Sequence, residues 1–164
     1  MSQIALYLFA VLMMMAAYFD ATRFTIPNWL CGLVALTFVV AVPFSGLGWS
    51  ELGLHALTGF AALLLGMLLF ATGTLGGGDA KLIAAAALWF GWPDTGWFIG
   101  FTALAGGGVA LLLLTLRRTV PMLPVPGGWI EGSALEDGAP VPYGIALAAG
   151  ALIVLPGHAF FAGV

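Results

Sequence analysis

Three consecutive glycines lead directly into an aspartate and a lysine in the sequence Gly76-Gly77-Gly78-Asp79-Ala80-Lys81. Long apolar runs lie on both sides of this cluster. An ionisable residue at membrane depth is costly and is by default a candidate for a functional site. Glycine tolerates positive φ and lets a backbone approach a ligand or a second helix closely. The cluster therefore indicates a site that faces water or protein rather than lipid.

A second carboxylate, Asp20, gives this cluster a possible chemistry. Two carboxylates that lie close together in a low-dielectric site cannot both ionise easily, so they share a proton. One member then acts as a base toward water, and the other protonates the departing group. Such a pair needs no metal, cofactor or nucleophilic side chain. On the residues alone, the alternative stays open that both are loop acids and that Asp79 caps a helix.

The composition predicts the class of protein that must position these two acids. The chain is 62% hydrophobic and only 7% charged, whereas soluble domains are near a quarter charged. We therefore expect a polytopic α-helical membrane protein. Four Lys and Arg residues in total are too few for a nucleic-acid-binding patch. The single cysteine, Cys31, allows no internal disulfide and is predicted to be a small buried hydrophobe.

Six apolar segments are long enough, or nearly so, to cross a bilayer. They cover residues 4–19, 29–44, 52–71, 80–92, 97–116 and 141 to about 155. We expect an all-α bundle of about six transmembrane helices that forms a single domain over residues 1–164. No Lys or Arg precedes the first segment, which favours a permanent span over a cleaved signal peptide. The Pro- and Gly-rich stretch 121–128 and the acidic residues after it predict a surface loop.

The positive charges predict the orientation of this bundle. Arg23, Lys81, Arg117 and Arg118 fall in the first, third and fifth connections, which lie on one side if there are six spans. That side is predicted to be cytoplasmic, so both termini are predicted to be periplasmic. The same count places Asp20 near the cytoplasmic interface together with the glycine cluster.

Three segments of the chain resemble one family of membrane proteases. Gly76 to Asp79 fits the GxGD motif of intramembrane aspartic proteases. Residues 20–28 resemble the first-aspartate segment of type IV prepilin peptidases, in which an Asp precedes a Pro-Asn or Pro-Asp pair by several residues. Residues 79–91 are similar to their second-aspartate segment, and Pro142-Tyr143-Gly144 is similar to the opening of their last helix. The resemblance covers nearly the whole chain.

This resemblance implies an aspartic endopeptidase that removes the leader of prepilins at the cytoplasmic face of the bacterial inner membrane. It also implies association with other pilus-assembly proteins. The short chain looks like the minimal subfamily that serves Flp-type (tight-adherence) pili. Larger relatives carry a cytoplasmic region with paired cysteines and also methylate the new N-terminus; this chain shows no such region, so methyltransferase activity is not expected.

The resemblance implies a role for two sets of residues. Asp20 and Asp79 would be the catalytic dyad, without a metal. A second set would bind substrate or shape the site, although Arg23 and Lys81 are also explained as anchors at the positive face. This set comprises Gly76, Gly77, Gly78, Lys81, Arg23, Pro142, Tyr143 and Gly144.

Two alternative functions remain open at this point. One is a related GxGD peptidase that acts on preflagellin-like substrates. The other is a small proton- or cation-coupled transporter, in which the two acids form an ion site. Both acids are predicted at one face, and no polar residues trace a path across the membrane, which counts against transport. His55 and His158 are assigned to the outer half and are not expected to be catalytic.

Overall fold

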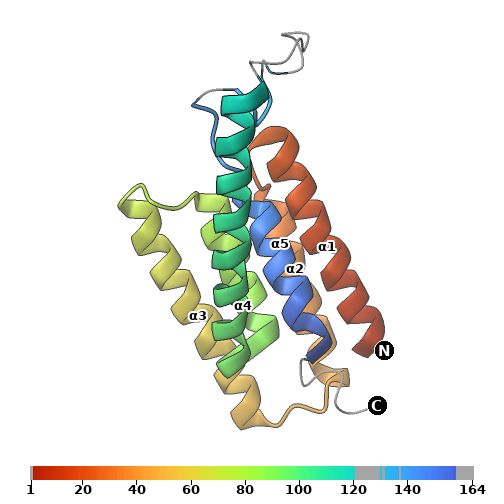
Figure 1. The fold of residues 1–164 in the computed structure, drawn as a ribbon. Coiled ribbons are helices and arrows are strands. Elements are labelled where there is room, and N and C mark those ends of the chain that lie inside the picture. Colours follow the sequence, from red (N-terminus) through yellow and green to blue (C-terminus); the bar gives the residue numbers. More distant parts are fainter. Residues whose placement is uncertain (1, 121–129, 131, 137, 158–164) are drawn as a thin grey trace.

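The computed structural model describes residues 2–120, 130, 132–136 and 138–157. The predicted surface loop at 121–128 and His158 lie outside the described residues. The described part is helical and contains no strand, which confirms the all-α prediction (Figure 1). Its elements are α1 (Ser2–Arg23), α2 (Asn28–Ala41), the 3-10 turn η1 (Val42–Phe44), α3 (Trp49–Ala71), α4 (Gly77–Thr119), α5 (Tyr143–Val154) and the 3-10 turn η4 (Leu155–Gly157).

Helix α4 contains a break that reverses the direction of the chain. Gly91 (φ 59°, ψ −164°) and Trp92 (φ −104°, ψ 136°) are not helical, and Pro93 follows them without an N–H to continue the helix. Figure 1 shows the part before the break running down the bundle and the part after it running back. We call these parts α4a (residues 77–90) and α4b (residues 93–119).

With this reversal, the described residues form six apolar helical segments, as expected. A hydrogen bond joins the Thr95 hydroxyl to the Ala87 carbonyl at 3.5 Å, whereas a continuous helix would separate residues eight apart by about 12 Å. The connection predicted at 93–96 is wrong in detail, because the turn is made at Gly91 and Trp92 and these four residues are already helical. The turn needs the positive φ of Gly91, which only glycine adopts easily.

The surface of the bundle is apolar along its length. Helices α1, α3 and α4 are long and apolar enough to cross a membrane, and 28–44 and α5 are shorter apolar segments. Large side chains such as Leu57, Leu65, Leu104 and Leu111 are more than 60% exposed. Side chains of this kind are stable on the outside only against lipid, because water would not favour so large an apolar surface. The chain is therefore a polytopic membrane protein.

Helix α4a lies at the centre of the packing. The fully buried Trp89 ring lies 4.9 Å from the ring of Phe9 on α1. Its indole N–H donates to the Val34 carbonyl of α2 at 2.9 Å, which satisfies the polar end of a buried tryptophan. On the opposite side α3 packs closely on α4a, since a Cβ at Gly66 would meet Ala80 at 2.9 Å. Such small-residue contacts are typical of membrane helix pairs.

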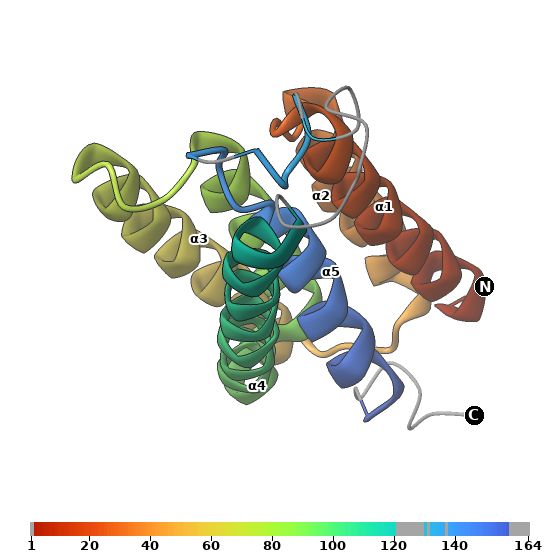
Figure 2. The ribbon, with the colours of Figure 1, turned by 45° about the horizontal axis from the view of Figure 1, so that its top comes forward.

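The helix ends sort into two groups at opposite ends of the bundle. Figures 1 and 2 show the end of α1, the starts of α4 and α5 and the end of α4b toward one end, with the start of α1 and the end of α5 at the other. The four basic residues belong to the first group: Arg23 ends α1, Lys81 lies near the start of α4, and Arg117 and Arg118 lie in its last turn. The aspartates lie at this same end.

Candidate functional site

Asp20 is held at the junction of α1 and α5. It lies in the last turn of α1 and is only 6% exposed. The backbone N–H of Gly144 donates to its Oδ2 atom at 2.6 Å. Gly144 lies in the first turn of α5, where N–H groups have no acceptor within the helix. The carboxylate of α1 thus supplies the acceptor that the start of α5 lacks, and the positive end of the α5 dipole favours its negative charge.

This contact requires glycine at position 144. An ideal Cβ built there would lie 2.7 Å from the Asp20 Cβ and 3.0 Å from its Oδ2. Pro142 precedes α5 with an extended backbone and is buried, whereas Tyr143 is about half-exposed. The Tyr143 ring faces Gly106 of α4b, where a Cβ would contact it at 3.6 Å. The start of α5, which the sequence predicted to bind substrate or shape the site, therefore contacts both Asp20 and α4b.

Asp79 belongs to the first turn of α4, which begins directly after Gly76. Its Oδ2 lies against the Gly76 backbone, since a Cβ at Gly76 would meet that oxygen at 2.7 Å. Its Oδ1 is buried and has no hydrogen-bond partner among the described residues. Buried polar atoms are nearly always paired. The unpaired oxygen is therefore available to a water or a substrate group.

Both carboxylates line one cavity of about 190 Å³. The lining consists of Asp20, Phe24, Thr25, Ile26, Gly76, Gly77, Gly78 and Asp79. The structure thus brings together the two aspartates and all three glycines of the cluster. Gly78 approaches the opposite wall closely, because its Cβ would lie 3.1 Å from the Ile26 Cβ and 3.2 Å from its carbonyl oxygen. Two acids and exposed backbone in one small cavity can hold a water beside a peptide bond.

The wall formed by residues 24–26 was not predicted. These residues belong to the stretch 20–28 that resembles the first-aspartate segment of prepilin peptidases, but the sequence assigned them no role in the site. Phe24 has a positive φ of 51°, which is uncommon for a residue other than glycine and turns the chain back over the aspartates. The only signal in the sequence is the position of these residues between Asp20 and Pro27.

The two basic residues predicted near the site do not line this cavity. The Lys81 ammonium donates to the Asn28 side-chain oxygen at 2.8 Å and so connects α4a to the first residue of α2. The Arg23 guanidinium lies over the Phe19 ring, 5.2 Å from its centroid. Cys31 is buried, as predicted, and its Sγ atom lies 3.8 Å from the carbonyl oxygen of Gly78. The Lys81 and Cys31 contacts join α2 to α4a beside the aspartates, whereas the Arg23 contact stays within α1.

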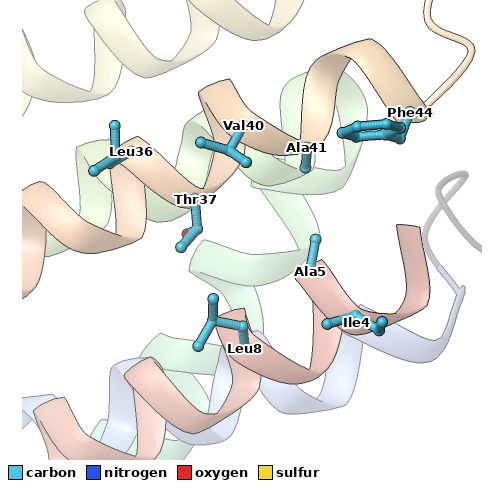
Figure 3. A pocket seen from close by; sticks show the side chains of 8 residues that line it. All are labelled: Ile4, Ala5, Leu8, Leu36, Thr37, Val40, Ala41 and Phe44. Atoms are coloured by element: carbon cyan, nitrogen blue, oxygen red, sulfur yellow. The ribbon is translucent and has the colours of Figure 1, made fainter. Parts of the chain in front are cut away.

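A larger hollow lies far from the two acids. Figure 3 shows the side chains that line this cavity between the start of α1 and the end of α2. Its volume is about 400 Å³, and Thr37 is the one polar side chain among the described residues that line it. The lining that the structure describes carries no carboxylate, imidazole, amine or thiol. His55 is buried on α3, where its Nδ1 atom lies 2.7 Å from the Leu88 carbonyl oxygen and its ring stacks on Phe38. Within the described ranges, three or more His, Cys, Asp or Glu side chains nowhere gather as a metal site would require.

A sequence model of the type IV leader peptidase family matches residues 7–116, from α1 through most of α4b. This match covers most of the chain and includes Asp20, Asp79 and the glycine cluster. The chain belongs to the type IV leader peptidase family. Comparisons with curated proteins and with solved structures gave no match. The predicted resemblance to prepilin peptidases is confirmed at the level of the family, and the protein is a membrane peptidase of the prepilin leader type.

Proposed function

We propose that this leader peptidase uses Asp20 and Asp79 as a catalytic dyad to cleave Flp-type prepilins at the cytoplasmic face of the inner membrane. The observation that supports this best is the single cavity that both carboxylates line, at the end of the bundle where the basic residues lie. The positive-inside rule supports a cytoplasmic location for that end. The start of α1 and the end of α5 are then periplasmic, and residues 1–164 act as one domain.

The contacts of the two acids suggest different roles for them. A closely spaced pair of carboxylates holds one proton. The N–H of Gly144 and the N-terminus of α5 favour the charged form of Asp20. The shared proton then resides on Asp79, whose Oδ1 lacks an acceptor or donor among the described residues. We assign Asp20 as the base and Asp79 as the acid.

Hydrolysis proceeds in two proton-balanced steps. Asp20 removes a proton from water while the water oxygen bonds to the carbonyl carbon of the scissile peptide, and Asp79 gives its proton to the carbonyl oxygen. The tetrahedral intermediate then collapses, the C–N bond breaks, and the amine takes the proton from Asp20. As the C–N bond breaks, one of the two hydroxyl groups of the intermediate becomes the C=O of the new carboxyl group and gives its proton to Asp79, which restores the starting state without a metal or cofactor.

The glycines give the substrate room to reach the dyad. An extended peptide is recognised through its backbone groups when it lies beside an exposed main chain. Gly76 and Gly77 present such a chain at the cavity, without side chains that would hold the substrate away. We propose that the leader lies across this segment and that the enzyme does not methylate its product.

Co-expression with an Flp-type prepilin tests the proposal. Leader removal is followed as a shift in gel mobility for the wild type, Asp20→Asn and Asp79→Asn. Asn keeps the shape of Asp but cannot cycle a proton, so each variant should leave the prepilin uncut. The matched control is Glu51→Gln, which changes an exposed carboxylate at the opposite end of the bundle and should cleave normally.

Two outcomes would reject the assignment. Full cleavage by both Asn variants would show that the two aspartates are not the catalytic dyad. Ion-coupled flux in liposomes without proteolysis would favour the transporter instead. A preflagellin substrate is run in parallel to distinguish a prepilin peptidase from a preflagellin peptidase, because only the preferred substrate should be cut completely.

A further inference from the structure

A cleft of about 420 Å³ runs between α2 and α3 over the surface of α4a, apart from the aspartate cavity. Each helix contributes four residues at positions i, i+3, i+4 and i+7, which share one helix face. These are Asn28, Cys31, Gly32 and Ala35 on α2, Ala56, Gly59, Phe60 and Leu63 on α3, and Lys81, Ala84, Ala85 and Leu88 on α4a. Seven steps of about 1.5 Å make the cleft roughly 10 Å long.

The cleft is polar at one end and apolar along the rest. Asn28 and Lys81 lie at the end where α2 and α4a begin. The remaining lining is small or hydrophobic, and Cys31 forms part of it. The Lys81 ammonium has three N–H donors, and Asn28 accepts only one of them. Within the part of the chain that the structure describes, no carboxylate pairs with Lys81, so its charge is left for a ligand.

The position of this polar end matches the headgroup level of a membrane. It lies at the end of the bundle that carries Arg23, Arg117 and Arg118. The apolar part extends from there along the helices, toward the middle of the predicted hydrocarbon layer. A ligand that fits must therefore carry a negative group at the surface and a hydrocarbon tail below it.

The chemistry of the cleft fits a lipid: one cation lies at its headgroup end, and the rest of its lining is small or apolar, as a single hydrocarbon chain requires. We propose that the cleft binds one anionic phospholipid, with an acyl chain between α2 and α3 and the phosphate on Lys81 and Asn28. This site does not depend on the proposed dyad, because neither aspartate lines it.

The chain carries its own reporter of cleft occupancy. Cys31 is the single cysteine of the sequence, lines the cleft, and is 5% exposed. An acyl chain in the cleft should slow its reaction with a neutral reagent such as N-ethylmaleimide. The full chain is placed in nanodiscs of phosphatidylcholine alone, or with a fifth of the lipid replaced by phosphatidylglycerol, and the alkylation rate is measured by mass spectrometry.

We expect alkylation to be about fivefold slower with phosphatidylglycerol, the effect of one basic residue on an anionic lipid. Lys81→Gln should abolish this difference, while Lys81→Arg should retain it. Gly32→Leu should abolish it by filling the cleft, since a Cβ at Gly32 meets nothing within 4 Å. Arg118→Gln is the matched control: it removes an exposed basic residue at the same end of the bundle that does not line the cleft, and it should keep the full difference.

Three results would overturn the proposal. Equal alkylation rates in the two lipids would show that no anionic lipid is preferred. An undiminished difference in Lys81→Gln would show that the surface charge of the membrane, and not this residue, causes it. Equal protection by inorganic phosphate added to phosphatidylcholine discs would show that the site binds a free anion rather than a lipid.

Discussion

Replacing Gly144 by alanine should abolish most of the leader peptidase activity while leaving the protein folded. The added methyl group would lie 2.7 Å from the Cβ of Asp20. Carbon atoms in ordinary contact are about 3.5–4.0 Å apart. Either Asp20 or the start of α5 must therefore move by roughly 1 Å, and the hydrogen bond from the Gly144 N–H to Oδ2 would be lost or bent.

The size of the loss follows from this displacement. Misplacing a catalytic group by about 1 Å costs on the order of 100-fold in rate. The fold itself should tolerate the change, because alanine favours a helix over glycine by roughly 1 kcal/mol and offsets part of the strain. We therefore expect kcat for a purified prepilin substrate to fall about 100-fold, with a much smaller change in KM.

Two other glycines serve as controls for this variant. A Cβ at Gly107 meets nothing within 4 Å, so Gly107→Ala should cleave at the wild-type rate. A Cβ at Gly150 of α5 would crowd Thr102 of α4b, because it would lie 2.8 Å from the Thr102 backbone nitrogen. It would not touch Asp20. Gly150→Ala should therefore lower the unfolding temperature and leave kcat within a few-fold of wild type. The reasoning is refuted if Gly144→Ala cleaves within threefold of wild type, or if Gly150→Ala loses as much kcat.

Further predictions concern the dyad, its chemistry and the fold. An epoxide, which reacts with an ionised carboxylate, should label Asp20, and a diazo reagent, which needs a protonated carboxylate, should label Asp79. If peptide mapping finds the epoxide on Asp79 and the diazo label on Asp20, the assigned roles are reversed. Cleavage should fall on both sides of a pH optimum, because a dyad works with one proton; a rate that only rises or only falls with pH would contradict shared protonation. EDTA should leave the cleavage rate unchanged, since two carboxylates activate water without a metal. Gly91→Ala should lower Tm by roughly 2–12 °C in detergent, because Gly91 has a backbone conformation that costs other residues about 1–3 kcal/mol. A Cβ at Gly91 would also meet the His55 ring at 2.8 Å. Gly96→Ala should leave Tm unchanged, because the atom nearest to its Cβ would lie 3.9 Å away.

The sequence was sufficient to predict the class of fold. Long apolar runs in a chain with few charges predict membrane helices, because lipid leaves backbone groups no partner outside the helix. The pairing of the GxGD cluster with Asp20 was also predicted, from the resemblance to prepilin peptidases and from the positive charges that place both acids at one face. Both inferences rest on local patterns, which survive folding unchanged.

The contacts between distant segments were not available from the sequence. Nothing near Asp20 shows that an N–H from residue 144 reaches it, because that depends on how α5 packs between α1 and α4b. The turn at Gly91 was placed a few residues late for a related reason. The proline marks the end of a helix, whereas the reversal needs a backbone conformation that one of several nearby glycines supplies. The sequence alone does not show which glycine has the positive φ.

The aspartate cavity is built from helix ends, and this explains its dependence on glycine. The end of α1 supplies Asp20, the start of α4 supplies Asp79, and the start of α5 supplies the N–H that holds the first acid. Helix ends have unpaired backbone groups, so they can hold a polar site where the middle of a membrane helix cannot. Three ends meet in one place only if the backbones approach within the width of a methyl group. A Cβ at Gly144 would meet Asp20 at the end of α1, and one at Gly78 would meet Ile26 in the connection after α1, so substitutions at both glycines should impair cleavage more than the loss of either basic residue nearby.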